Sequence, residues 1–304
     1  MNLFPRLLKD LMSQYRNLLI SNKQFITNKG SKNMNPNKAL WEKGDFTKVA
    51  AFMRQSGEEL VNSLEIVAPI RVLDLGCGDG TTAVPLARLG AAVTGIDIAQ
   101  NLVEAGNRRA KEAGLDRLTF HEGDACDLTG VSDNSFDLTL TVFGAMFAPK
   151  PFDVARELVR VTKPGGRIVM GNWIPNDTTS FISQLLKIVS SFMPPPAEGF
   201  ISPMLWGVDT HIIERFEQAG VPKEKISMVK DTFTFIAPDK SPEEFIESFK
   251  NFYGPTMNAF EAARNNGVEE DLHSQLLELA KACNNSTDGG TSITATFLRV
   301  TVNL

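Results

Sequence analysis

The stretch from Val72 to Thr81, with the sequence VLDLGCGDGT, constrains the fold more than any other part of the chain. A short apolar run contains the acid Asp74, and a turn follows with glycine at every second position. Glycine has no Cβ, so it reaches positive φ and lets a ligand lie directly against the backbone. A strand, a glycine turn and a helix N-terminus at the edge of a parallel sheet form a crevice of nucleotide size.

A second acid, Asp97, ends the next predicted strand (91–96), where a carboxylate can accept hydrogen bonds from ribose hydroxyls. The turn does not match the dinucleotide pattern G-x-G-x-x-G, because Thr81 stands where the third glycine is needed. The chain also lacks the G-x-x-x-x-G-K-[ST] loop that cradles phosphates. The spacing therefore argues against a pyrophosphate-binding site.

The sequence D-L-G-C-G-D-G resembles the cofactor loop of class I S-adenosylmethionine (SAM) methyltransferases. This resemblance implies that SAM is the cofactor and that the acid and the loop backbone serve its methionine end, while the second acid binds its ribose. The positions implied for the cofactor are Asp74, Gly76, Cys77, Gly78, Asp97 and Ile98. The alternative is a structural glycine turn in another α/β protein, with Cys77 as a small side chain that fills space.

Two later turns extend the resemblance. The turn 122–125 is similar to the family's adenine-binding turn, in which Asp124 would accept from the exocyclic amine and the Ala125 N–H would meet a ring nitrogen. The loop 143–147 follows the fourth predicted strand, where ligands of α/β sheets bind. Gly144 there permits close approach, and Phe143 provides apolar surface for the sulfonium region. A generic turn carboxylate and core packing are the respective alternatives.

From residue 70 onward, strands alternate with helices, which predicts a doubly wound, mostly parallel sheet. The resemblance implies seven strands with a reversed terminal hairpin, matched by the β-rich runs 225–237 and 291–302. The pattern L-x-R-V-x-K-P-G-G-R (158–167) is closest to the ubiquinone/menaquinone C-methyltransferase branch. Helical insertions at 175–208 and 239–290 are expected to form a lid over the substrate.

The chain divides into an extension, 1–33, and a methyltransferase domain, 34–304, with its core at 66–174. The extension is basic and amphipathic, with six Lys and Arg against one Asp, which fits organelle targeting, a membrane-surface helix or a helix docked on its own domain. Residues 39–64 are predicted to be helical. Trp41 and Asp45 at their start are candidates for cofactor or substrate contact, or for a core anchor and a helix N-cap.

Composition limits the partners. The net charge of −5 argues against a general affinity for nucleic acid, and no apolar run has the roughly 18 residues of a membrane span. Three scattered cysteines provide neither a disulfide framework nor a zinc site, so we expect no metal and a reducing, cytoplasmic location. The oligomeric state is not predicted.

Methyl transfer from a sulfonium needs a general base only when the acceptor must lose a proton. Two residues are candidates for that chemistry, His211 at the start of the helix predicted over 207–219 and Tyr253 in the second insertion. Each has a structural alternative, and Asp209 or Thr210 is expected to cap that helix. The expected function is methylation of a small hydrophobic or amphipathic acceptor. The alternatives are a quinone-ring C-methyltransferase and a subunit that binds SAM or S-adenosylhomocysteine without turnover.

Overall fold

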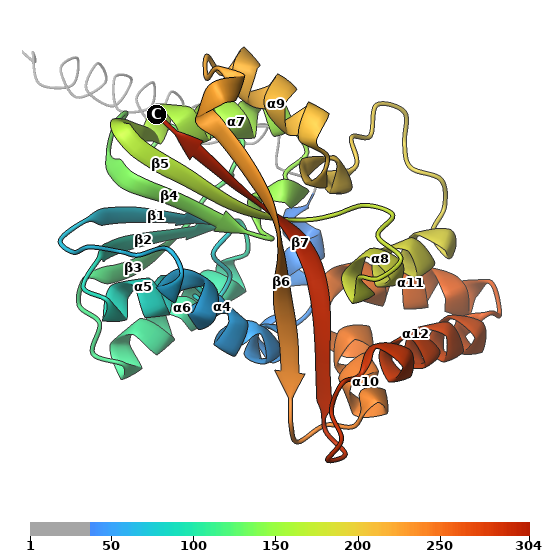
Figure 1. Cartoon of the computed structure of the whole chain (residues 1–304). Coiled ribbons are helices and arrows are strands. Elements are labelled where there is room, and N and C mark those ends of the chain that lie inside the picture. Colours follow the sequence, from blue (N-terminus) through green and yellow to red (C-terminus); the bar gives the residue numbers. More distant parts are fainter. Residues whose placement is uncertain (1–36) are drawn as a thin grey trace, which may run out of the picture. The chain divides into compact units, whose positions relative to one another are not determined.

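The computed structural model describes residues 37–304, so the expectations for the extension 1–33 lie outside the described residues. The centre of the fold is a seven-stranded sheet in the order β3-β2-β1-β4-β5-β7-β6, shown in Figure 1. Its strands are β1 Arg71–Leu75, β2 Ala92–Asp97, β3 Leu118–Glu122, β4 Phe136–Val142, β5 Thr162–Trp173, β6 Ile226–Ala237 and β7 Thr291–Asn303. β7 alone runs antiparallel to its neighbours β5 and β6, which confirms the reversed terminal hairpin.

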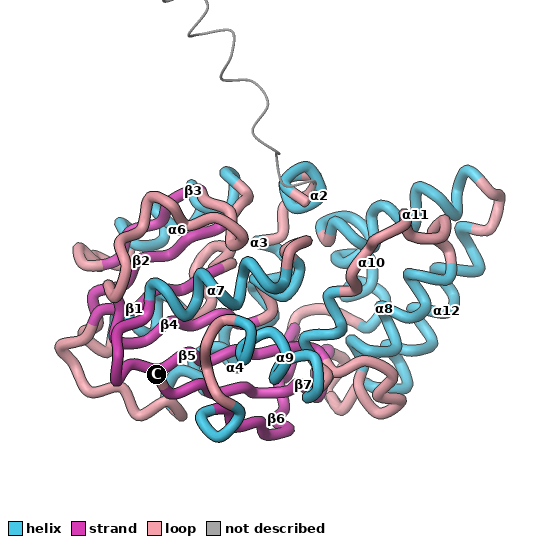
Figure 2. Tube along the Cα trace, turned by 90° about the horizontal axis from the view of Figure 1, so that it is seen from above, coloured by secondary structure: helices cyan, strands magenta, loops and turns pink. Residues whose placement is uncertain are grey.

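Helices cover both faces of the sheet, as the strand–helix alternation predicts (Figures 1 and 2). β1 is buried at every position after Arg71, because a parallel strand at the centre is covered on both sides. One face carries α4 Arg54–Asn62, α5 Ala83–Arg88 and α6 Gln100–Glu112, and the other carries α7 Pro151–Val161 and α9 Asp209–Gln218.

Two local expectations are wrong. The segment predicted as one helix over 39–64 is broken into α2 Lys38–Glu42, α3 Thr47–Ala50, the 3-10 helix η1 Ala51–Met53 and α4. The break falls near Gly44, where a Cβ would lie 2.7 Å from the carbonyl oxygen of Phe252, so a side chain at this position would clash with the backbone of that residue. α9 begins at Asp209 after the N-cap Val208, which has no side-chain capping bond, so neither Asp209 nor Thr210 is the cap.

The terminal hairpin is longer than the strand beside it. β6 and β7 pair from Ile226–Val302 to Ala237–Thr291, whereas β5 reaches β7 only from residue 297 onward. The overhanging part of the hairpin lies beside the helices of the two insertions, α8 Phe181–Ser191, α10 Pro242–Phe252, α11 Gly254–Asn265 and α12 Glu269–Cys283 (Figure 1). α10 begins with a capping box, in which Ser241 and Glu244 bond each other's backbone N–H.

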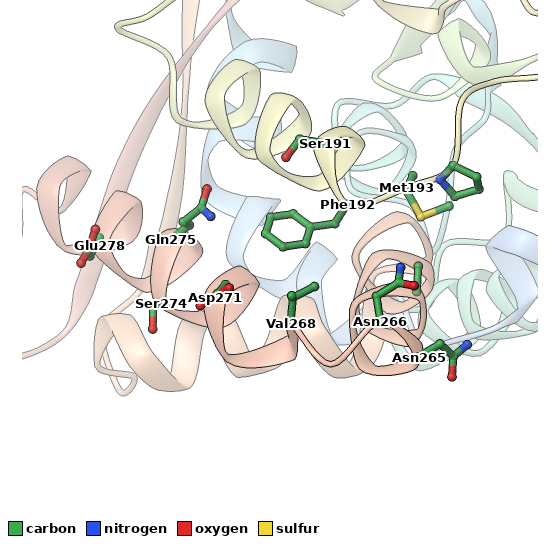
Figure 3. A pocket seen from close by; sticks show the side chains of 12 residues that line it. Ser191, Phe192, Met193, Asn265, Asn266, Val268, Asp271, Ser274, Gln275 and Glu278 are labelled. Carbon is green, nitrogen blue, oxygen red and sulfur yellow. The ribbon is translucent and has the colours of Figure 1, made fainter.

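The insertion helices enclose a groove of about 810 Å³ between the end of α8 and the helices α11 and α12. Phe192, Met193 and Val268 line it beside polar residues such as Asp271 and Gln275, as Figure 3 shows. None of the residues proposed for the cofactor lines this groove. Within residues 37–304, no helix is both long enough and apolar enough to cross a membrane.

Candidate active site

The glycine loop after β1 contains three glycines with positive φ, Gly76 at 67°, Gly78 at 55° and Gly80 at 91°. A Cβ on Gly76 would lie 2.6 Å from the Cα of Gly144, and one on Gly80 would lie 2.7 Å from the ring of Phe120. Among residues 37–304, nothing lies within 4 Å of the place where a Cβ on Gly78 would stand. The outer glycines therefore serve packing, while Gly78 presents bare backbone to open space.

Asp97, at the end of β2, ties this loop to the neighbouring strand. Its Oδ2 accepts a hydrogen bond from the Gly78 N–H at 2.8 Å and its Oδ1 accepts one from the Ala99 N–H at 2.9 Å. Ile98, half-buried next to it, also donates its N–H to this carboxylate. Burial raises the pKa of Asp97 above its usual value. The predicted ribose acid thus also determines the position of the glycine loop.

Asp74 is 1% exposed and faces the start of the first crossover helix. Its Oδ2 accepts a hydrogen bond from the hydroxyl of Thr82 at 2.6 Å. Burial raises the pKa of Asp74 to about 7, and the negative charge of Asp97 adds to this effect. The hydrogen bonds from Thr82 and from the Ala83 backbone lower the pKa, but by less. Asp74 therefore exchanges its proton near neutral pH.

This raised pKa predicts a pH-dependent stability. The folded chain keeps the Asp74 proton up to pH about 7, whereas the unfolded chain loses it near 4, so the stability that Asp74 contributes is lost as the pH rises between these values. Asp74→Asn has no carboxyl to titrate at this position. Between pH about 4 and about 7, we therefore expect the free energy of unfolding of the wild type to fall more than that of Asp74→Asn, by an amount on the order of 1–4 kcal/mol. Urea unfolding at several pH values measures this difference. Parallel pH profiles for the two proteins would contradict it.

Asp79 in the loop was not singled out from the sequence. It is 1% exposed, and its Oδ2 lies 2.9 Å from Nη2 of Arg54 on α4 and 3.4 Å from Nη1 of Arg109 on α6. Arg109 also donates to the Asp79 carbonyl at 2.6 Å. The acid is visible in the sequence, but its partners stand 25 and 30 positions away, and no local pattern relates them to the loop.

Cys77, between the first two loop glycines, is 6% exposed. Its Sγ lies 2.9 Å from the position that a Cβ on Gly95 would take, so the thiol fills the space that this glycine leaves. Burial raises the pKa of the thiol well above its usual value. The side chain is thus a neutral packing group beneath the loop.

The loop after β4 meets the glycine loop through backbone atoms. A Cβ on Gly144 would lie 2.3 Å from the carbonyl oxygen of Gly76. Phe143, just before it, has a φ of 56°, which is strained for a bulky residue. Its ring turns into the core and stacks on Trp173 with centroids 3.6 Å apart. A contact between Phe143 and the cofactor stays a prediction.

Asp124 and Ala125 follow β3, whose Glu122 pairs with Asp97 in the sheet, so the predicted adenine turn lies beside the predicted ribose acid. Asp124 Oδ1 accepts a hydrogen bond from the Cys126 N–H at 2.8 Å. Both residues are half-buried. The structure therefore brings the proposed adenine, ribose and methionine positions to neighbouring points of one sheet edge.

Residues 37–46 run across this edge and contact the loops on it. Asn37 donates to the carbonyl of Phe147, Lys38 pairs with Glu122, and the ring of Trp41 lies 5.0 Å from that of Phe147. Further along, the amide of Asn101 donates to the Gly44 carbonyl at 3.2 Å. This strap (residues 37–46) thus joins the ends of β3 and β4 to α6.

Trp41, Phe46 and Tyr253 form an aromatic cluster, with ring centroids 5.9 Å apart for each pair that includes Tyr253. Asp45 Oδ1 accepts hydrogen bonds from the backbone and hydroxyl of Thr47, so it bonds the first turn of α3. Tyr253 is 7% exposed, and burial raises the pKa of its hydroxyl above the usual value. A neutral phenol in this position can donate a hydrogen bond but is a poor base.

His211 lies on α9, apart from the aromatic cluster. Its side chain is 40% exposed, and its Nδ1 lies 3.7 Å from Oε2 of Glu214. α9 contacts the 3-10 helix η3 (Pro203–Gly207), and η3 in turn contacts η2 (Ala145–Phe147) in the loop after β4. The two catalytic candidates therefore approach the loops from different elements, and their roles stay predictions.

Comparisons with known proteins agree with this geometry. Residues 73–170 match the family model described as a methyltransferase domain. The chain is 32% identical over 224 residues to an uncharacterized protein of Mycobacterium tuberculosis, covering 73% of this chain and 78% of the relative. The chain belongs to the class I SAM-dependent methyltransferases.

Two further proteins resemble this methyltransferase, one in sequence over part of the chain and one in fold over most of it. The chain is 42% identical over 113 residues to a demethylmenaquinone methyltransferase of Clavibacter sepedonicus. These residues make up 36% of this chain and 45% of the relative. The structure of YcgJ from Bacillus subtilis shares the fold, with a TM-score of 0.51 and 18% identity over 81% of this chain and 97% of that one. Methyltransferases of this family use SAM as the methyl donor.

Proposed function

We propose that this methyltransferase binds SAM at the edge formed by β1, β2, β3 and β4 and transfers its methyl group to a small hydrophobic or amphipathic acceptor. The observation that carries the proposal is the bare Gly78 backbone, which faces open space and is held by Asp97. A backbone without side chains leaves room for a ligand, and a carboxylate beside it suits ribose hydroxyls.

The proposed roles follow the geometry. Asp97 binds the ribose hydroxyls with the lone pairs that its bonds to the N–H groups of Gly78, Ile98 and Ala99 leave free. Asp124 and Ala125 bind the adenine, and Asp74 with Gly76 serves the methionine end, where a nearby cation favours the ionised form of the carboxyl. SAM supplies an already activated methyl group, so the protein's main task is to hold donor and acceptor in line at about 3–3.5 Å.

A quinone ring is a second candidate acceptor. It is favoured by the likeness to the demethylmenaquinone methyltransferase, but that likeness covers 36% of this chain. The insertion helices around the groove in Figure 3 lie beyond the cofactor core, in segments that vary with substrate in such folds.

Calorimetry with SAM, S-adenosylhomocysteine and NADH tests the cofactor. We expect heat from the first two and none from NADH, because the glycine spacing does not fit a pyrophosphate. Binding of NADH alone would overturn the proposal. A screen of phenols, thiols, amines and quinols with labelled SAM would then identify the acceptor class, and binding without turnover would indicate a regulatory subunit.

His211→Ala tests the proposed base. We expect unchanged SAM affinity, because His211 lies on α9 and not at the cofactor edge, together with a turnover lowered by about 10²–10⁴ for an acceptor that must lose a proton. Steady-state kinetics with a phenol acceptor measures the change. His273→Ala, which alters a histidine on α12, is the matched control. Equal turnover in wild type and His211→Ala would assign this histidine a structural role.

A further inference from the structure

Three buried donors on one side of the molecule lack an acceptor. Within residues 37–304, the buried side-chain atoms without a hydrogen-bond partner include Asn172 Nδ2, Trp206 Nε1 and Arg215 Nη1. They come from β5, η3 and α9, and η3 contacts both of the other elements. Buried polar groups in folded proteins are almost always bonded, so three unpaired donors in adjoining elements indicate a missing acceptor.

Arg215 is the most unusual of the three. It is 2% exposed, and its guanidinium lies 4.4 Å from the centre of the Trp206 ring. Within the described part of the chain its side chain makes no hydrogen bond or ion pair. Glu214 beside it is 53% exposed and lies 3.7 Å from His211; its charge raises the pKa of Arg215, but no ion pair joins these two side chains. An unpaired buried charge costs several kcal/mol, and the cation–π contact offsets only part of that.

The arginine keeps its charge at neutral pH. Burial lowers the pKa of Arg215 to about 10, which is still well above 7. The missing acceptor is therefore expected to carry negative charge.

The position of these donors connects them to the proposed site. A Cβ on Gly207, next to Trp206, would lie 2.1 Å from the carbonyl oxygen of Trp173, so η3 is pressed against the end of β5. η3 also contacts η2, which begins one residue after Gly144. The donors thus adjoin the loop after β4, on the side of the sheet that carries α7 and α9 (Figure 1).

We propose that Arg215 and Trp206 bind a carboxylate of the methyl acceptor, which makes the acceptor an amphipathic carboxylic acid; this rests on the proposed function. A carboxylate is planar, accepts hydrogen bonds only and matches the fork of one guanidinium. Its single negative charge balances the single buried cation, whereas a phosphate would carry more charge than one arginine neutralises. The neighbouring side chains are apolar and buried: the ring of Phe216 lies 6.2 Å from that of Trp206, and Met146 lies in η2, which contacts η3.

An acid must enter between η3 and α9, because Trp206 and Arg215 are 1% and 2% exposed. The chain before η3, residues 194–202, forms neither helix nor strand. The proposal therefore requires this segment to shift together with η3, which would separate η3 both from α9 and from the end of β5.

Nuclear magnetic resonance of the indole N–H groups tests the proposal in the full chain. The protein has three tryptophans, and Trp206→Phe identifies the relevant signal. We expect benzoate and octanoate to shift this signal in a saturable way, and the neutral benzamide to leave it unmoved. Arg215→Met should weaken the response at least tenfold, while Arg156→Met, which removes an exposed arginine on α7, should not change it.

Thermal unfolding provides a second readout that a structural arginine would not give. Because Arg215→Met removes an unpaired buried charge and keeps an apolar chain of similar length, we expect this variant to melt at the same or a higher temperature. A lower melting temperature together with no response of the wild type to either acid would overturn the subsite.

Titration of the same samples with SAM separates the two proposals. Absence of SAM binding would contradict the proposed function itself. SAM binding by the wild type without any shift of the Trp206 signal on adding acid would contradict the carboxylate subsite alone.

Discussion

Gly144→Ala is expected to lower both the stability and the SAM affinity of this methyltransferase. The new Cβ would lie 2.3 Å from the Gly76 carbonyl oxygen and 2.7 Å from the Gly76 Cα, and backbone atoms cannot move aside as a side chain can. Forcing a methyl group into such a contact costs about 1–3 kcal/mol or more. At about 2–4 °C per kcal/mol, the melting temperature should fall by about 2–12 °C.

The affinity should fall because the displaced segment is the cofactor loop itself. We expect calorimetry to show SAM binding at least tenfold weaker, which corresponds to about 1.4 kcal/mol. Gly130→Ala is the matched control, since nothing lies within 4 Å of its added Cβ. A Gly144→Ala protein that melts and binds SAM like the wild type would show that the two loops do not meet as described.

Asp97→Ala should weaken SAM binding by about 100-fold, or ~2.7 kcal/mol, while the chain stays folded. Two effects contribute. The ribose hydroxyls lose charge-assisted hydrogen bonds, and the N–H groups of Gly78 and Ala99 lose their acceptors, so the glycine loop is held less firmly. Calorimetry measures the affinity, and circular dichroism checks the fold.

A ligand lacking the 2′-hydroxyl separates these two effects. If Asp97 binds the ribose, the losses from Asp97→Ala and from 2′-deoxy-S-adenosylhomocysteine should not add, because both remove the same interaction. Additive losses would mean that Asp97 acts only through Gly78. Wild-type affinity of Asp97→Ala for SAM would place the ribose elsewhere.

The alternation of strands and helices and the glycine loop could be predicted because their signals are local. Glycines at alternate positions after an apolar run, and acids at the ends of two runs, are readable within about ten residues. The loop at 143–147 follows from the rule that ligands bind at the carboxyl ends of parallel strands, whereas the turn at 122–125 was indicated by its resemblance to the family's adenine-binding turn. The helix over 39–64 was predicted wrongly, and its break lies near Gly44, which packs against Phe252, a residue 208 positions away that no local pattern relates to it.

In the candidate site, too, some residues could be predicted from local sequence and others could not. The sequence indicated Asp74 and Asp97 but not the Arg54–Asp79–Arg109 cluster that holds the loop between α4 and α6. It indicated Phe143 as a residue at the loop after β4, but not that its ring would stack on Trp173 in the core. Side-chain direction at a strained backbone position depends on the space that the neighbouring strands leave.

The sequence by itself therefore determined the family, the alternation of strands and helices and the place of the cofactor loop, because each depends on residues close together in the chain. Only the tertiary structure decided that Gly76 and Gly144 touch through their backbones, and that Arg215 lies buried over Trp206 without an ion pair to any acid in the described part of the chain. These features join segments far apart in sequence, and they depend on how whole elements pack rather than on any spacing along the chain.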